Sequence, residues 1–303
     1  MDHPYLLHIF SPTKYVSPFD INMAYEAQFD DVIPYCNVEL DEVHGLTQDT
    51  IFSRSPEGVK RTGIFIGGRE FGLSLEMLAA ARAAMVPPFE VSVMADPSGA
   101  ITTAAAMVAL AGHWLGRAGG ELGNSRVCVF GGTGPVGMCV ALLAARAGAQ
   151  AAIVSHQGLG AAQLVADRMT RDFGARIHGL DGSSNDAVAQ WLGDIDIAFS
   201  AAKAGVRVVE SAQLAAAGAL KVLADANAVP PSGIEGVDAN DRGKPLAVGD
   251  GSTAYALGAL AIGDIKYRVH TSLLRQMYSA AEPVYLGCDE AYATACKVVA
   301  ERD

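Results

Sequence analysis

The sequence predicts an α/β protein of two domains with mainly parallel β-sheets. Short β-rich apolar runs alternate with helical patterns along most of the chain, which is typical of repeated βα units. A glycine-rich turn joins one such strand to a helix. The length, 303 residues, suits two domains of ordinary size. We expect one α/β domain over residues 1–118, completed by helices within 265–303, and a second α/β domain over 119–264.

In the first domain, the strands are expected at residues 5–10, 31–35, 63–67 and 91–94. Ser17-Pro-Phe-Asp20 has the form of a helix N-terminus, and residues 71–85 form a further helix. A long helix begins near Thr102, links the two domains and ends at Gly119-Gly120.

In the second domain, a buried-strand run at residues 126–130 leads into Gly132-x-Gly134-x-x-Gly137, a helix over 136–147 and a strand over 151–154. This is the βαβ setting of a dinucleotide-binding (Rossmann) turn. Gly132 would allow the tight turn, Gly134 would let the backbone approach a pyrophosphate, and Gly137 would let the helix pack on the strand. The alternative is a strand-to-helix turn with no ligand. The residues expected to contact NADP or NAD here are Gly132, Thr133, Gly134, Pro135, Val136 and Gly137.

The end of the next strand bears on the choice of coenzyme. An acidic residue about twenty positions after the glycines would bind the ribose 2′-hydroxyl of NAD, but this strand ends at Ser155-His156-Gln157. Ser155 and Gln157 could donate hydrogen bonds to a 2′-phosphate, and His156 could add positive charge. The turn therefore allows NADP and does not exclude NAD. The alternative is an ordinary solvated loop.

Two further strands are expected at residues 195–200 and 220–226, followed by a Pro- and Gly-rich loop. Because ligands of open α/β sheets bind beyond the carboxyl ends of the strands, we expect the residues there to border the cofactor. For Asp225 and Asn227 the alternative is turn chemistry, and for Lys203 it is exposure to solvent. The residues concerned are Ser200, Ala201, Lys203, Asp225 and Asn227.

Composition narrows the class of protein. The formal net charge is −11 with no basic run, which argues against nucleic acid or an anionic membrane as a partner. Five cysteines without a C-x-x-C pair suit a reducing cytoplasm and no structural zinc. The N-terminus lacks the basic and apolar regions of a signal peptide, and the richest apolar run, 136–155, is broken by Arg146. We expect a cytoplasmic protein.

Nucleophile-elbow and zinc-helix motifs are absent from the sequence, so hydride transfer is the chemistry that remains. Lys266 and His270 lie four residues apart on a helix expected over 258–280, and therefore share one face. For Lys266 the alternative is a solvated charge, and for His270 a hydrogen-bonded core histidine. Thr102 and Thr103 either contact substrate or only start the linking helix.

Six segments outside the glycine motif are specific enough to compare with known proteins: 17–22 (SPFDIN), 46–54 (LTQDTIFSR), 61–68 (RTGIFIGG), 95–99 (ADPSG), 227–234 (NAVPPSGI) and 258–266 (GALAIGDIK). These segments resemble a known family, the bacterial NAD(P)-dependent methylenetetrahydromethanopterin dehydrogenases of methylotrophs. The resemblance covers nearly the whole chain. Ala202-Lys203 departs from it, since a smaller, Gly-containing turn is expected there.

The resemblance implies an N-terminal pterin-binding domain completed by the C-terminal helices, a Rossmann domain, and catalysis in the cleft between them. The reaction would oxidise methylene-tetrahydromethanopterin to the methenyl form, with hydride passed to NADP or NAD and no metal. Lys266 would be the catalytic lysine, acting as a neutral amine or through positioning, and Asp20 would orient the pterin ring. Thr102, Thr103 and His270 would bind substrate. A homotrimer is also implied.

Two other functions stay open. A methylenetetrahydrofolate dehydrogenase would use the same chemistry on another carrier. A dinucleotide-binding sensor without turnover would bind coenzyme but tolerate replacement of Lys266.

Overall fold

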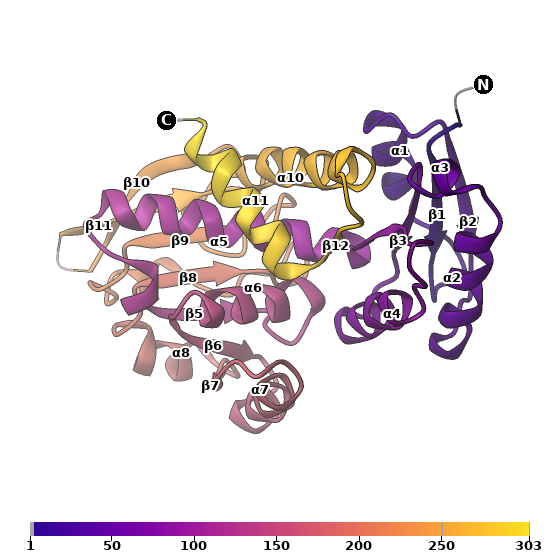
Figure 1. Cartoon of the computed structure of the whole chain (residues 1–303). Coiled ribbons are helices and arrows are strands. Elements are labelled where there is room, and N and C mark those ends of the chain that lie inside the picture. Colours follow the sequence, from indigo (N-terminus) through magenta and orange to yellow (C-terminus); the bar gives the residue numbers. More distant parts are fainter. Residues whose placement is uncertain (1–2, 250, 303) are drawn as a thin grey trace. The chain divides into compact units, whose positions relative to one another are not determined.

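The computed structural model describes residues 3–249 and 251–302 and divides into two compact units (Figure 1). Unit 1 comprises Met1–Thr102 and Tyr267–Thr294, and unit 2 comprises Thr103–Lys266 and Ala295–Asp303. Residues 103–118, 265–266 and 295–303, expected in the first domain, therefore group with unit 2. The physical reason is that single helices continue from one unit into the other, so no change of composition marks the boundary. These helices are α5 (Ala100–Arg117), α10 (Ala259–Ser279) and α11 (Cys288–Ala300).

The described residues of unit 1 form a five-stranded parallel sheet in the order β12-β4-β3-β1-β2. Its central strands are buried on both faces, and Leu7, Ile9 and Ile64 have no exposed surface, as a sheet covered by helices requires. The strands are β1 (Leu6–Phe10), β2 (Asp31–Tyr35), β3 (Thr62–Ile66), β4 (Ser92–Ala95) and β12 (Tyr285–Leu286). The helices are α1 (Pro18–Glu26), α2 (Val43–Phe52), α3 (Pro56–Val59) and α4 (Phe71–Ala83).

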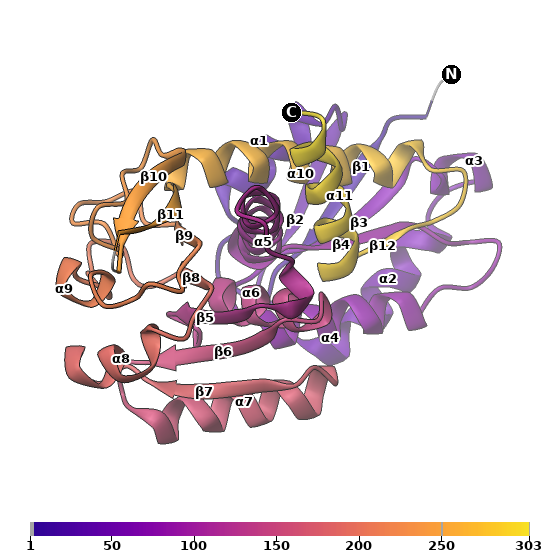
Figure 2. The same cartoon turned by 90° about the vertical axis from the view of Figure 1, so that its left-hand side faces the viewer.

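The described residues of unit 2 form a seven-stranded sheet in the order β10-β11-β9-β8-β5-β6-β7. All neighbouring pairs are parallel except the edge pair β10 and β11. The strands are β5 (Arg126–Phe130), β6 (Gln150–Ser155), β7 (Ile177–Asp181), β8 (Ile197–Ser200), β9 (Val222–Asp225), β10 (Arg242–Val248) and β11 (Ser252–Leu257). Figure 2 shows α7 (Leu159–Phe173) running alongside β7. The other helices are α6 (Pro135–Arg146), α8 (Asn185–Leu192) and α9 (Ser211–Leu214).

The expected α/β fold and glycine turn are confirmed, and each expected strand is present within two residues of its predicted ends. Four strands were not expected from the sequence: β7, β10, β11 and β12. β10 contains Arg242, Gly243, Lys244 and Pro245, residue types that disfavour strands. It forms because it lies at the sheet edge, where proline is tolerated. β12 has only two residues, too few to show a period.

Among the described residues, one helical stretch, 97–117, is long and apolar enough to cross a membrane by length and composition. The richest apolar run was expected at 136–155 instead, so that expectation missed this stretch. In the structure 72% of the most apolar part of this stretch is buried, as in the core helix of a folded domain, so its composition is weak support for a membrane span.

Candidate functional site

The glycine turn between β5 and α6 is built by close backbone contacts. A Cβ placed on Gly132 would lie 2.4 Å from Ile153 Cβ, and one on Gly137 would lie 2.4 Å from the carbonyl oxygen of Gly131. Gly131 itself has φ +70°, a left-handed conformation that favours glycine. The tight turn thus depends on Gly131, and not on Gly132 as expected. Gly132 instead allows close packing against β6.

Gly134 differs from its neighbours because space is open in front of it. It is the N-cap residue of α6, and the only nearby atom that its Cβ would meet is the Gly131 oxygen at 3.4 Å. Pro135 occupies the first turn, where its missing N–H costs nothing, and Val136 and Gly137 follow with amides free of helical partners. A helix N-terminus with open space before it suits a pyrophosphate, so these residues fit a dinucleotide.

The loop after β8 packs against this turn. A Cβ on Gly131 would lie 2.5 Å from the Ala201 carbonyl oxygen, which explains why a residue without a side chain is needed there. Ser200 is fully buried, and its Oγ has no hydrogen-bond partner among the described residues. The side chain of Lys203 is exposed. Ser200 and Ala201 therefore lie beside the glycine turn, while Lys203 extends from the same loop into solvent.

Asp225 and Asn227, at the end of β9, are engaged by the backbone around them. Asp225 accepts hydrogen bonds from the N–H groups of Asn227 (3.0 Å) and Ile234 (3.0 Å). Asn227 accepts from the N–H groups of Gly205 and Val229. Both side chains are buried and hold the Pro- and Gly-rich loop in place. Turn chemistry therefore accounts for these contacts, and a role beside the nicotinamide stays a prediction.

In the turn after β6, which is expected to influence the choice of coenzyme, Ser155 is buried and its Oγ accepts a hydrogen bond from the Gln157 N–H (3.1 Å). His156 and Gln157 are exposed. Asp181, which was not among the predicted site residues, pairs with Ser155 in register across β6 and β7. The Ser183 N–H donates to its Oδ1 (2.9 Å) and lowers the pKa of Asp181, so this carboxylate is ionised at neutral pH.

Asp181 thus supplies an acidic residue beside the turn after β6, where the sequence around Ser155 had shown none. A Cβ on Gly158, in the same turn, would lie 3.9 Å from Asp181 Oδ1. An aspartate at the end of a short apolar run was the available signal. Its relevance depended on knowing that β7 is the neighbour of β6.

In unit 1, Asp96, Thr102 and His270 form a buried hydrogen-bond network. Asp96, after β4, accepts hydrogen bonds from the N–H groups of Ile101 (2.8 Å) and Thr102 (3.1 Å) and from Thr102 Oγ1 (2.6 Å). His270 Nδ1 lies 2.9 Å from Asp96 Oδ2. Thr102 and His270 are fully buried, so both support Asp96 from within the core. Asp96 itself was not among the predicted site residues, although it lies in one of the segments that carry the family resemblance.

Asp20 lies on α1, where Ser17 caps the helix by accepting a hydrogen bond from the Phe19 N–H. The carboxyl group is buried, which is unusual for aspartate. Its Oδ2 lies 3.6 Å from where a Cβ of Gly67 would be, next to the carboxyl end of β3. The ring of Phe19 meets that of His270 edge-on at 5.5 Å. Asp20 and the Asp96 network therefore gather at the same end of the unit 1 sheet.

Lys266 is half-buried on α10, one helical turn before His270. Thr103 is half-buried on α5, next to the buried Thr102.

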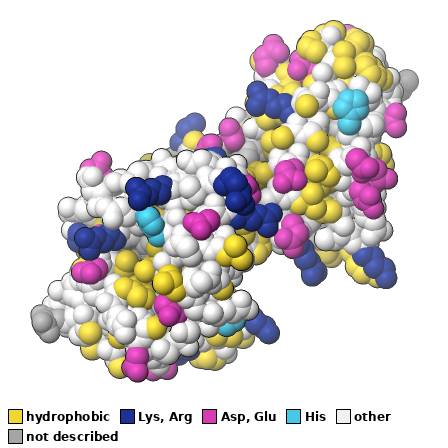
Figure 3. All heavy atoms as spheres, turned by 90° about the horizontal axis from the view of Figure 1, so that it is seen from below, with side chains coloured by type: hydrophobic (Ala, Val, Ile, Leu, Met, Phe, Trp, Pro, Cys, Tyr) yellow, Lys and Arg dark blue, Asp and Glu magenta, His cyan; other side chains and the backbone are white. Residues whose placement is uncertain are grey.

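Acidic and basic side chains are interspersed on the face of the molecule shown in Figure 3. No group of three or more histidine, cysteine or carboxylate side chains able to hold a metal was found among residues 3–249 and 251–302.

The parallel strand order of the sheets, with a glycine turn of Rossmann geometry in unit 2, places this protein in the class of α/β proteins with a dinucleotide-binding fold. Quinate dehydrogenase from Corynebacterium glutamicum, solved in complex with NAD, has a similar fold, with a TM-score of 0.53, 12% identity and coverage of 96% of this chain and 98% of that one. The family model described as methylene-tetrahydromethanopterin dehydrogenase, N-terminal, matches residues 18–98.

Two curated relatives from Methylorubrum extorquens specify the family. An NAD(P)-dependent methylenetetrahydromethanopterin dehydrogenase is 42% identical over 97% of this chain and 98% of its own length. A bifunctional protein named MdtA is 32% identical over 92% of this chain and 94% of its own. The chain belongs to the methylenetetrahydromethanopterin dehydrogenase family. The family resemblance seen in the sequence is therefore confirmed.

Proposed function

We propose that this protein oxidises 5,10-methylene-tetrahydromethanopterin to the methenyl form and passes a hydride to NADP or NAD. The observation that carries the proposal is the 42% identity to an NAD(P)-dependent enzyme of that name over nearly the full length of both chains. The open space before Gly134 at the α6 N-terminus supports the coenzyme half of the reaction.

This reaction requires that the reacting groups be positioned, and it does not require acid–base groups in the hydride-transfer step. When NADP or NAD is bound, its nicotinamide supplies the hydride acceptor. A C–H bond of the methylene carbon breaks with its electron pair, and the positive charge left behind is shared by the two nitrogens that flank this carbon. Because no proton moves in this step, the residues need only hold the reacting carbons in place and keep water out.

Lys266 and Asp20 are the proposed catalytic residues. We assign Lys266 to the one-carbon unit, as a neutral amine or a positioning group, and Asp20 to the amino and amide nitrogens of the pterin ring. The burial of Asp20 supports its role, because a carboxylate held in a dry site binds N–H donors strongly. Thr103, Thr102 and His270 are the proposed substrate-binding residues, of which the last two are seen to hold Asp96.

The coenzyme preference follows from the turn after β6. The exposed side chains of His156 and Gln157 favour a 2′-phosphate, whereas the Asp181 carboxylate beside them favours a ribose hydroxyl. We propose that both NADP and NAD are used.

The reaction would belong to one-carbon metabolism, at the level of formaldehyde oxidation in a methylotroph. We propose a cytoplasmic homo-oligomer without a metal. Low cysteine use without C-x-x-C pairs supports this location.

The test is absorbance of reduced nicotinamide with purified protein and either methylene-tetrahydromethanopterin or methylenetetrahydrofolate, each with NADP and with NAD. We expect turnover with the methanopterin carrier. Faster turnover with the folate carrier would identify a methylenetetrahydrofolate dehydrogenase. Coenzyme binding without turnover on either carrier would favour the sensor.

Variants at Lys266 test its role in the same assay. Lys266→Ala should lower kcat by about 100-fold or more, a typical effect for losing a group that acts on the reacting atoms. Lys221→Ala is the matched control. Lys221 lies at the amino end of β9, away from the carboxyl ends of the strands where the cofactor is expected, and it forms an ion pair with Asp196. Equal activity of the two variants would remove Lys266 from the mechanism.

A further inference from the structure

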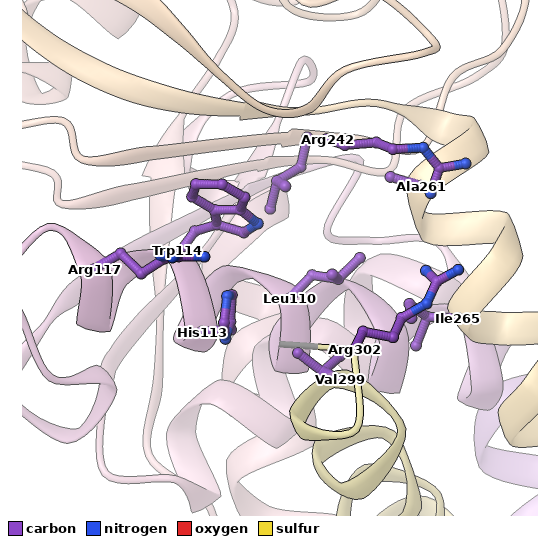
Figure 4. Close-up of a pocket in the computed structure, with 10 residues that line it drawn as sticks. Leu110, His113, Trp114, Arg117, Arg242, Ala261, Ile265, Val299 and Arg302 are labelled. Atoms are coloured by element: carbon purple, nitrogen blue, oxygen red, sulfur yellow. The ribbon is translucent and has the colours of Figure 1, made fainter.

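A cavity of about 340 Å³ lies within unit 2, away from the glycine turn. Residues of α5, β10, β11, α10 and α11 line it (Figure 4). β10 is the edge strand, and β11, β9 and β8 separate it from β5, which carries the glycine turn. The cavity is therefore distinct from the dinucleotide site.

Basic side chains dominate the polar lining of this cavity. Arg117, Arg242 and Arg302 line it, together with His113, and no carboxylate is among the described lining residues. This is unusual in a chain whose net charge is −11. Because the arginines come from α5, β10 and the turn after α11, which are distant in sequence, only the fold brings them together.

Two of the arginines share one carboxylate. Asp264 Oδ2 accepts hydrogen bonds from Arg242 Nη1 (3.5 Å) and from Arg302 Nη2. Figure 4 shows both guanidinium groups extending toward the helix that carries Ala261 and Ile265. Each guanidinium has five N–H donors, so one carboxylate satisfies only part of the pair and leaves an excess positive charge. Such a pair is suited to hold a phosphate through paired N–H donors.

The remainder of the lining is apolar. Leu257 and Ile265 have no exposed surface, and Leu110 and Val299 are also buried. Trp114 completes the wall, with the Arg117 guanidinium 5.3 Å from its ring centroid. A cavity with an apolar wall and a few charged groups at one place is the usual form of a site for a small organic molecule.

We propose that this cavity is a second ligand site, which binds a small phosphorylated organic molecule. The phosphate would accept from the N–H donors of Arg242 and Arg302 that Asp264 leaves unused, and the apolar body would lie against Leu110, Ile265 and Val299. The volume is at the lower end of the range for small-molecule sites and suits a ligand of mononucleotide size.

Calorimetric titration with phenyl phosphate, inorganic phosphate and phenol tests the proposal. We expect wild-type protein to bind phenyl phosphate most tightly, inorganic phosphate more weakly, and phenol not measurably. Arg242→Gln combined with Arg302→Gln should weaken phenyl phosphate binding at least tenfold. Both side chains are partly exposed, 56% for Arg242 and 36% for Arg302, so this variant should fold, which circular dichroism checks.

The matched control is Arg168→Gln combined with Arg171→Gln, which removes two exposed arginines from α7 and should leave binding unchanged. Val299→Phe fills the cavity and keeps the arginines, so it should weaken phenyl phosphate binding but spare inorganic phosphate. Absence of binding by the wild type, or equal binding by the two double variants, would overturn the proposal. Neither outcome depends on dehydrogenase activity.

Discussion

His270 Nδ1 lies 2.9 Å from Asp96 Oδ2, and both side chains are fully buried. Asp96 also holds the first turn of α5 through the N–H groups of Ile101 and Thr102. One carboxylate therefore ties α10 to the start of α5 within unit 1. Lys266 is one turn before His270 on the same helix.

Asp96→Ala should destabilise the protein severely. It removes the acceptor for two backbone N–H groups, the Thr102 hydroxyl and the His270 ring, all of them buried. Leaving such groups unpaired costs about 3–5 kcal/mol. Urea unfolding of the variant and the wild type measures this difference. Asp31→Ala, at an exposed strand position, is the control, and an equally small loss for both would contradict the proposed importance of the network.

Two glycines of the turn after β5 should separate stability from coenzyme binding. Gly132→Ala places a Cβ 2.4 Å from Ile153 Cβ and should cost about 1–3 kcal/mol of unfolding free energy. Gly134→Ala meets only the Gly131 oxygen at 3.4 Å and should fold normally. It should nevertheless raise the coenzyme Kd about tenfold, because it intrudes on the phosphate position. Thermal unfolding and fluorescence titration measure the two effects, and a reversed pattern would be incompatible with the assigned roles.

Asp181 should influence the choice between NADP and NAD. Its ionised carboxylate lies beside the turn that carries Gln157. Asp181→Asn removes a negative charge and should raise the NADP-to-NAD ratio of kcat/KM several-fold. Glu235, another half-buried carboxylate on unit 2 with a lowered pKa, provides the control, and Glu235→Gln should leave the ratio unchanged. A ratio unaffected by Asp181→Asn would place the 2′-phosphate away from β7.

His8 should make stability depend on pH. Burial lowers the pKa of His8 below its ordinary value, and the charge of Arg54 lowers it further. The unfolded chain, with a histidine pKa of about 6.5, therefore takes up the proton first as the pH falls. The stability contributed by neutral His8 is present above that pH and is lost as the pH falls through the lower folded pKa.

The comparison of wild type with His8→Asn isolates this effect. The variant should be less stable than wild type at pH 8, where the wild-type ring also contacts Tyr35 Oη at 3.2 Å. The difference should shrink at pH 5. Urea unfolding at both values measures it, and a difference independent of pH would show that His8 titrates normally.

The parts of this protein that the sequence predicted are those with a local physical signal. Residues 126–137 combine an apolar strand run with glycines at fixed spacing, and the structure has β5 and the turn there. The helix start at Ser17 is predicted by a capping side chain and a proline, and Ser17 caps α1. Strands such as β10 could not be predicted, because their residue types are compatible only with the edge position that the fold provides.

By itself, the sequence determined the α/β class and the βαβ unit with its glycine turn, because periodicity, capping and turn chemistry act over a few residues. The family was indicated separately, by the resemblance of segments such as 17–22 and 258–266 to known members. Only the tertiary structure decided that Asp181 lies beside Ser155, that Asp96 meets His270 across 174 positions of the chain, and that three arginines share one cavity. Such contacts depend on strand order and on where each chain segment returns to its sheet, which local patterns do not specify.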